Sequence, residues 1–186
     1  MNIYRAGIDI GSTTVKLVII DENDKIVYAE YLRHCAQTQR TLSKLISDAV
    51  KKLGDCMLKV SITGSGAINL AKAMDIDFIQ EVVAVASAIK KNHPHTDVAI
   101  ELGGEDAKII YFKGGLDERM NGVCAGGTGS FIDQMAALLQ TDAEGLNKEA
   151  ANYKEIYPIA ARCGVFAKTD IQPLINEVAT KPDLAS

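Results

Sequence analysis

The sequence predicts an α/β fold built from two similar halves, and two observations lead to this prediction. A strand, an acid, a glycine turn and a second strand follow one another around residues 9–16 and again around 100–108. The order strand, strand, strand, helix also opens both halves. Because self-similarity along a chain indicates a repeated architecture, we expect a first half over residues 1–92 and a second over 93–186.

Hydrophobic periodicity predicts each element of the first half in turn. The expected order is strands at 4–10, 14–21 and 25–33, a helix over 38–53, a strand over 57–63, a short helix over 66–73, a brief strand at 78–79 and a helix over 81–91. Gly54 gives the stop signal of the first helix. The last helix is rich in alanine and valine, so we expect it to be mostly buried.

The second half repeats the opening strands and then becomes helical. We expect strands at 97–102, 107–112 and 116–121, followed by helices over 128–140, 142–151 and 166–178. Residues 181–186 are expected to trail off after the last helix. Since the remaining elements of the first half have no counterpart here, we expect a truncated second half and a fragment or segment of a larger protein; a minimal stand-alone variant is the alternative.

Composition excludes several classes of protein. The chain has 186 residues, of which 47% are hydrophobic, and a net charge of -4, which argues against nucleic-acid binding. No signal peptide is visible, and no apolar run approaches the roughly 20 residues of a membrane span. We therefore expect a cytoplasmic protein without disulfides. Cys35 and Cys56 are interpreted as core residues.

The first glycine turn has the chemistry of an anion site. Its residues present backbone N–H groups and hydroxyls, and Lys16 adds a positive charge suited to phosphate. Asp9, at the end of the first strand, could hold magnesium through water, because Mg²⁺ keeps most of its hydration shell. A plain hairpin with a Gly-Ser tip is the alternative. The second turn, with Glu101 as its acid, favours nucleotide binding over that alternative.

Two cysteines stand where helices are expected to begin. Cys124 precedes the helix over 128–140, and Cys163 precedes the helix over 166–178. Helix N-termini favour anions, and a thiolate-ligated iron–sulfur cluster is an anion. A symmetric dimer would supply the four thiolates that a cubane takes. Two buried cysteines that fill small spaces are the alternative, and spacing alone favours it.

The two glycine turns, together with residues 121–131 and 162–166, resemble the activators of 2-hydroxyacyl-CoA dehydratases and the ATPase subunits of benzoyl-CoA reductase. The resemblance covers nearly the whole chain, and the cysteine segment is its most specific part. It implies the duplicated ribonuclease H-like fold of actin-like ATPases. It also implies a homodimer with one [4Fe-4S] cluster held by Cys124 and Cys163 of each subunit.

The resemblance further implies an ATPase that passes a low-potential electron to a dehydratase or related reductase component. Ferredoxin or flavodoxin would donate that electron, and ATP, ADP and Mg²⁺ would be the nucleotide ligands. The residues expected to hold the phosphates are Gly11, Ser12, Thr13, Thr14 and Lys16 in the first turn and Gly103 and Gly104 in the second. Asp9, Glu101 and Asp106 would organise magnesium and water.

The chain departs from the family pattern at two positions of the second turn. Glu101 stands where the family usually has Asp, and Glu105 stands where it usually has Gln. The adenosine-binding glycine motif of the family lies in a C-terminal segment that this sequence does not contain. Two alternative functions therefore stay open: a small-molecule kinase of the same superfamily, acting on a sugar, and a non-catalytic regulatory module.

Overall fold

The computed structural model describes residues 2–121, 126–161, 163–177 and 179–186. The chain forms two compact units, Met1–Asp97 and Val98–Ser186. Cys124 lies outside the described residues. No helix in the described ranges is long and apolar enough to cross a membrane.

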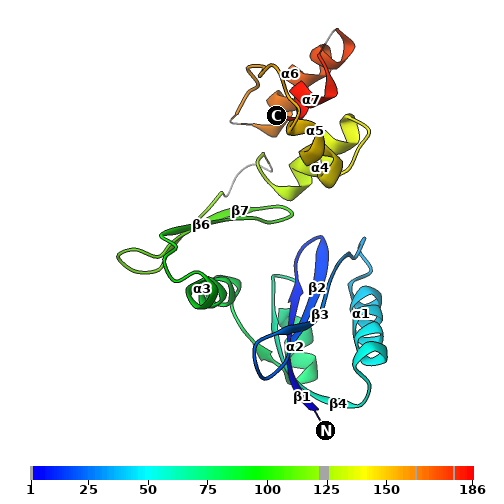
Figure 1. Cartoon of the computed structure of the whole chain (residues 1–186), viewed down its shortest axis with the longest axis vertical. Coiled ribbons are helices and arrows are strands. Elements are labelled where there is room, and N and C mark those ends of the chain that lie inside the picture. Colours follow the sequence, from blue (N-terminus) through cyan, green and yellow to red (C-terminus); the bar gives the residue numbers. More distant parts are fainter. Residues whose placement is uncertain (1, 122–125, 162, 178) are drawn as a thin grey trace. The chain divides into compact units, whose positions relative to one another are not determined.

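The first unit is a mixed sheet with helices, as the apolar periodicity predicts. Its elements in chain order are β1 (Asn2–Ile10), β2 (Thr14–Ile20), β3 (Ile26–Arg33), α1 (Thr38–Leu53), β4 (Cys56–Thr63), α2 (Ile68–Met74), β5 (Asp77–Phe78) and α3 (Glu81–Asn92). Figure 1 shows this unit in blue to green. Its strands are ordered β3-β2-β1-β4-β5. β1 pairs antiparallel with β2 and parallel with β4, so the ends of β1 and β4 lie at the same edge of the sheet.

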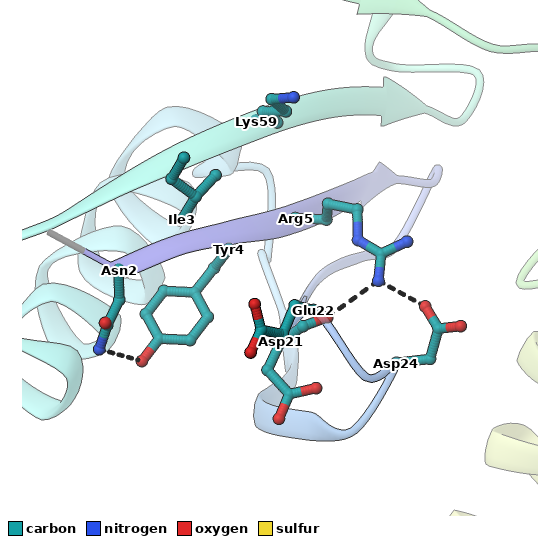
Figure 2. Close-up of a pocket in the computed structure, with 8 residues that line it drawn as sticks. All are labelled: Asn2, Ile3, Tyr4, Arg5, Asp21, Glu22, Asp24 and Lys59. Carbon is teal, nitrogen blue, oxygen red and sulfur yellow. Dashed lines mark hydrogen bonds and ion pairs between the residues drawn. The ribbon is translucent and has the colours of Figure 1, made fainter.

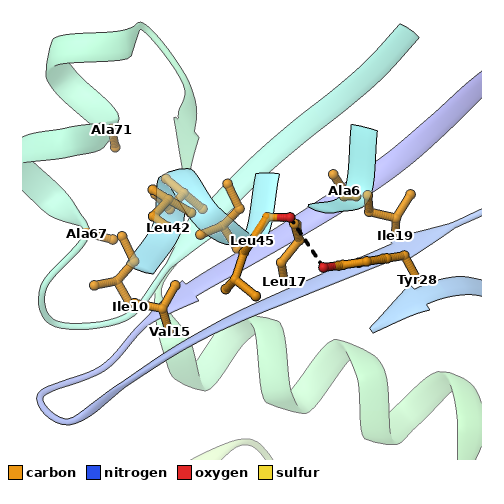
Figure 3. Packing of buried hydrophobic residues seen from close by; sticks show 13 residues of the cluster. Ala6, Ile10, Val15, Leu17, Ile19, Tyr28, Leu42, Leu45, Ala67 and Ala71 are labelled. Carbon is orange, nitrogen blue, oxygen red and sulfur yellow. Dashed lines mark hydrogen bonds between the residues drawn. The ribbon is translucent and has the colours of Figure 1, made fainter. Parts of the chain in front are cut away.

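The core of the first unit lies between one face of this sheet and helices α1 and α2. Leu45 of α1 is 1% exposed, and Val15 of β2 is fully buried. Figure 3 shows these side chains packed together and the Tyr28 hydroxyl donating to the carbonyl oxygen of Leu45 at 3.3 Å. This packing extends along β1 and β2 up to the glycine turn that joins them, since Ile10 and Val15 on either side of the turn are both buried.

The second unit continues from the first without a break in the chain. Its elements are β6 (Val98–Leu102), β7 (Ala107–Tyr111), β8 (Asp117–Met120), α4 (Gly129–Leu138), α5 (Ala143–Ala150), α6 (Gly164–Asn176) and α7 (Lys181–Ala185). The three strands form an antiparallel sheet in the order β6-β7-β8. The α/β class is therefore confirmed. The duplication and the truncation stay predictions.

Three expectations about individual segments are wrong. Residues 181–186 do not trail off, because Thr180 caps α7 by accepting from the backbone N–H of Asp183. α3 is not mostly buried: Ala86 is its only buried residue, and Val83 is 44% exposed, since apolar composition does not ensure a packing partner. Cys35 is exposed, because it lies in a turn after β3 with a φ of 44°, and Cys56 is half-buried at the start of β4.

Candidate functional site: two glycine turns and a helix start

The first glycine turn joins β1 and β2 at the edge where β4 also ends. The N–H of Gly11 donates to the carbonyl oxygen of Thr14 at 3.0 Å and closes the turn. The N–H of Gly66 donates to the carbonyl oxygen of Ile10 at 2.9 Å, so the loop after β4 lies against the same turn. Ser12 and Thr13 form the tip. The hairpin predicted from residues 9–16 is thus present. Its turn lies at the end of the sheet where β4 also ends.

Asp9 and Lys16 face each other across this hairpin. They are register partners in β1 and β2, and Lys16 Nζ lies 2.5 Å from Asp9 Oδ2. The Lys16 ammonium also lies 5.4 Å from the ring centroid of Tyr31 on β3. A carboxylate and an aromatic face both attract an ammonium group. Lys16 is therefore held beside the turn as a fixed positive charge.

The second carboxylate oxygen of Asp9 has an unusual environment. Asp9 Oδ1 and Thr63 Oγ1 are both buried, and neither has a hydrogen-bond partner among the described residues. The two residues are register partners in β1 and β4, so these oxygens lie on adjacent strands at the same level. Buried polar atoms normally have a partner. Two orphaned oxygens beside a glycine turn fit a hydrated magnesium ion, which binds through oxygen ligands and retained water.

Gly64 brings the loop after β4 close to Asp9. Its φ is +97°, and a Cβ at this position would lie 2.3 Å from the carbonyl oxygen of Ile10 and 2.5 Å from Asp9 Oδ1. Any side chain here would displace the carboxylate or the end of β1. Glycine is therefore required for the compact arrangement around Asp9.

The second glycine turn repeats the cross-strand pair of an acid with a lysine. Glu101 and Lys108 are register partners in β6 and β7. Lys108 Nζ lies 3.9 Å from Glu101 Oε1 and 3.3 Å from Asp106 Oδ2. The Lys108 side chain is 7% exposed, whereas the side chains of Glu101 and Asp106 are 25% and 37% exposed, so a buried ammonium lies beside two partly exposed acids. This arrangement brings together Glu101 and Asp106, the two acids of the second turn that the sequence predicts as site residues.

Gly103 and Gly104 are tied to the start of α4. The N–H of Gly129 donates to the carbonyl oxygen of Gly103 at 2.8 Å, and that of Ser130 donates to Gly104 at 3.0 Å. A Cβ at Gly103 would lie 2.2 Å from Asp106 Oδ1, so the Asp106 carboxylate folds over this glycine. Two backbone hydrogen bonds thus join the second glycine turn to the first residues of α4.

Cys163 is the N-cap of α6, as expected, and its thiol is free and half-buried. A Cβ at Gly164 would lie 2.9 Å from Cδ2 of Phe131, so the starts of α6 and α4 pack closely. Beside them lies a cavity of about 350 Å³, which Cys163 lines together with Phe131, Met135 and Ile171. Of the two cysteines expected to bind a cluster, Cys163 is the one within the described residues. Among those residues, no group of three or more His, Cys, Asp or Glu side chains is placed to hold a metal ion.

A larger hollow of about 660 Å³ lies at the other end of β1 (Figure 2). Arg5 lines it and donates to the carbonyl oxygen of Asp21 at 2.9 Å and to Asp24 Oδ1 at 2.5 Å. Lys91 of α3 pairs with the same carboxylate. The hydrogen bonds from Lys91 and Arg5 lower the pKa of Asp24 below its ordinary value. The Asp24 carboxylate thus bridges a cation of β1 and a cation of α3, which suits a structural connection between these two elements.

The sequence profile of the BadF/BadG/BcrA/BcrD ATPase family matches residues 6–185. The chain belongs to this family. It is 32% identical to the 2-hydroxyisocaproyl-CoA dehydratase activator of Clostridioides difficile, over 98% of this chain and 70% of that protein. It therefore spans about 70% of the length of this relative.

Two solved activator structures have the same fold. One is the activator of the 2-hydroxyisocaproyl-CoA dehydratase from Clostridium difficile with bound ADPNP, with a TM-score of 0.84 and 32% identity over 98% of this chain and 69% of that one. The other is component A of the (R)-2-hydroxyglutaryl-CoA dehydratase of Acidaminococcus fermentans, with a TM-score of 0.82 and 27% identity over 98% and 72%. The fold of this family member is that of dehydratase activators.

Sequence reasoning missed two residues of these sites. Thr63 has an orphaned buried oxygen beside Asp9, and its only sequence signal is its place directly before the Gly64 turn. Lys108 lies between the two acids of the second turn. Its signal was available, since it stands in the second motif where Lys16 stands in the first.

Proposed function

We propose that this chain carries the phosphate-binding turns and the cluster cysteines of an ATP-dependent activator of a 2-hydroxyacyl-CoA dehydratase. The observation that carries the proposal is the pair of orphaned oxygens, Asp9 Oδ1 and Thr63 Oγ1, beside a glycine turn that also holds Lys16. Membership in an ATPase family and the ADPNP-bound relative support nucleotide binding.

The residues of the first turn have distinct roles in this proposal. The backbone N–H groups and hydroxyls of Ser12, Thr13 and Thr14 donate to phosphate oxygens, and Gly11 leaves room for them. Lys16 adds charge from the side of the sheet. Asp9 and Thr63 orient the water molecules of a magnesium ion, which neutralises phosphate charge when it is bound.

The second turn contributes in a similar way. Gly103 and Gly104 are proposed to contact phosphate through their backbone. Glu101 and Asp106 are proposed to orient water or magnesium-bound water, and the Lys108 ammonium between them offsets part of their negative charge. The longer side chain of Glu101 is compatible with this role, because its contact with magnesium passes through water.

Electron transfer is the second part of the proposal. Cys124 and Cys163 of two subunits would hold one [4Fe-4S] cluster, which supplies one-electron chemistry at low potential. Cys163 fits a cluster ligand, because its free thiol stands at the positive N-terminal end of α6. Val165 and Phe166, in the first turn of α6, are 71% and 65% exposed. Exposed apolar side chains beside the thiol suit an interface with a second copy. Ferredoxin or flavodoxin would be the electron donor.

Iron analysis tests the proposal directly. After anaerobic purification and reconstitution we expect a dimer with about two iron atoms per chain, since one cubane takes thiolates from both subunits. Cys163→Ser and Cys124→Ser should lose that iron, whereas Cys35→Ser, at an exposed cysteine, should keep it. MgATP hydrolysis is measured on the same samples. Full iron in Cys163→Ser, or neither iron nor nucleotide turnover in the wild type, would contradict the proposal.

A further inference from the structure

His34 makes four hydrogen bonds around the first glycine turn. Its backbone N–H donates to the carbonyl oxygen of Thr13 at 3.1 Å, and its Nε2 lies 3.3 Å from the carbonyl oxygen of Gly11. Its Nδ1 accepts from the N–H of Ala36 at 3.1 Å, and its carbonyl oxygen accepts from Gln37 at 2.7 Å. One residue directly after β3 thus contacts two carbonyl groups of the turn.

These contacts determine which nitrogen of the neutral ring carries the proton. A backbone N–H can only donate, so Nδ1, which faces the N–H of Ala36, is the acceptor. The proton of the neutral imidazole is then on Nε2, and Nε2 donates to the carbonyl oxygen of Gly11. Both ring nitrogens are satisfied in this one tautomer, which also fixes the orientation of the ring.

Holding the two carbonyls also orients two backbone donors of the turn. In a trans peptide the C=O of one residue and the N–H of the next point in opposite directions. With the carbonyls of Gly11 and Thr13 directed at His34, the N–H groups of Ser12 and Thr14 are directed away from it. These are two of the donors that the proposed function assigns to phosphate.

The backbone after His34 is strained. Cys35 and Ala36 have φ values of 44° and 61°, and the bond from Gln37 to His34 closes a four-residue turn around them. Such turns usually hold glycine or asparagine at these positions. Since neither residue favours this conformation, contacts elsewhere must maintain it. The contacts of His34 with Gly11, Thr13 and Ala36 do so, and strain of this kind is often retained at functional sites.

We propose that His34 is a positioning residue, which orients the phosphate-binding turn through the Nε2 bond to the carbonyl oxygen of Gly11. The inference rests on the proposed nucleotide-binding function of this turn. His34 itself does not touch phosphate. It acts by holding the peptide planes of the turn in the conformation in which Ser12 and Thr14 present their N–H groups.

Three substitutions distinguish the effects of the two hydrogen bonds that the His34 ring makes. His34→Gln places an amide N–H where Nε2 stands and keeps the bond to Gly11. His34→Asn places an acceptor where Nδ1 stands and keeps the bond to Ala36 but does not reach Gly11. His34→Ala loses both bonds. The matched control is His95→Gln, at an exposed histidine of the same unit.

Calorimetric titration with MgADPNP, together with thermal unfolding, tests the inference. We expect His34→Ala and His34→Asn to raise the Kd about tenfold, because a change of this size is within the range that the loss of one hydrogen bond produces. His34→Gln and His95→Gln should bind like the wild type. A merely structural role would instead make affinity follow stability. If His34→Ala does not fold, the difference in Kd between the Gln and Asn variants decides the question.

Two results would overturn the inference alone. One is an unchanged Kd in the folded His34→Ala or His34→Asn variant. The other is a wild-type Kd in His34→Asn together with a raised Kd in His34→Gln. Absence of MgADPNP binding by the wild type would instead overturn the proposed function, and the inference with it. The wild-type titration therefore separates the two failures.

Discussion

Asp9 places its two carboxylate oxygens in different environments. Oδ2 is bound to Lys16, whereas Oδ1 is buried beside Thr63 and against Gly64. One oxygen is thus committed to the protein, and the other is directed at the position where we propose a hydrated magnesium ion.

The first prediction concerns the charge of Asp9. Asp9→Asn should lower the rate of MgATP hydrolysis about 10²-fold, because it removes the charge that orients water beside the phosphates. The rate is measured as phosphate release at saturating nucleotide. Asp48→Asn, at a partly exposed acid of α1, is the control and should leave the rate unchanged. Equal rates for both variants would remove Asp9 from the proposed site.

The second prediction concerns the glycine that packs against Asp9. Gly64→Ala should lower the free energy of unfolding by about 3 kcal/mol, since it combines an unfavourable φ of +97° with a Cβ 2.3 Å from a backbone oxygen. Gly7→Ala, in β1, has nothing within 4 Å of the new Cβ and should raise stability by about 0.5 kcal/mol. Urea denaturation measures both. A similar loss in the two variants would mean that the contact at Gly64 does not matter.

At the scale of elements, α7 secures the segment that leads to Cys163. Asp183 is 8% exposed and accepts from the N–H of Lys154 at 2.6 Å and of Glu155 at 2.9 Å. The Thr180 hydroxyl donates to its other oxygen at 2.6 Å. A short helix at the end of the sequence thus fastens residues 154–155 of the chain that runs from α5 to α6.

The third prediction follows from the pKa of Asp183. The hydrogen bond from Thr180, followed by those from Lys154 and Glu155, lowers this pKa below its ordinary value of 3.8. The carboxylate therefore stabilises the fold above that value and loses its contribution as the pH falls through the lower folded pKa. Asp183→Asn should lower the melting temperature at neutral pH. Its difference from the wild type should shrink below about pH 3.8.

Thermal unfolding over a pH series measures this difference. Asp117→Asn, at an exposed acid of β8 that pairs with Arg119, is the matched control. It should show a much smaller effect, because a solvated ion pair contributes little to stability. A pH-independent effect of Asp183→Asn would show that the charge of the carboxylate is not what fastens the segment.

At the scale of the whole molecule, the two units differ in how they bury apolar side chains. The main cluster of buried residues lies entirely in Met1–Asp97 and joins β1, β2 and β4 to α1 and α2. The first glycine turn, at which we propose phosphate binding, follows β1 of this cluster. The second unit has a smaller sheet, and residues of its four helices α4, α5, α6 and α7 together line the cavity of about 350 Å³.

The fourth prediction is that residues 1–97 fold cooperatively by themselves, because their core needs no residue of the second unit. Circular dichroism and urea denaturation of the isolated segment test it. Within that segment, Leu45→Ala should cost about 2–5 kcal/mol, since Leu45 is 1% exposed. A segment without a cooperative transition would contradict the prediction.

Most elements could be predicted from the sequence because their signals are local. Apolar periodicity and Gly54 gave α1 within its observed bounds, and the strands around both glycine turns were predicted to within a few residues. α7 was missed although Thr180 and Asp183 form a recognisable capping pair. Burial of α3 was wrong, because an apolar composition does not specify what a helix packs against.

The sequence by itself determined the class of fold, the place of the two glycine turns and the family resemblance, since each depends on residues close together in the chain. Only the tertiary structure decided that Thr63 lies beside Asp9 and that His34 holds the carbonyl of Gly11. Strand register and long-range hydrogen bonds create both relationships. They join residues far apart in sequence, and no local pattern of residue types encodes them.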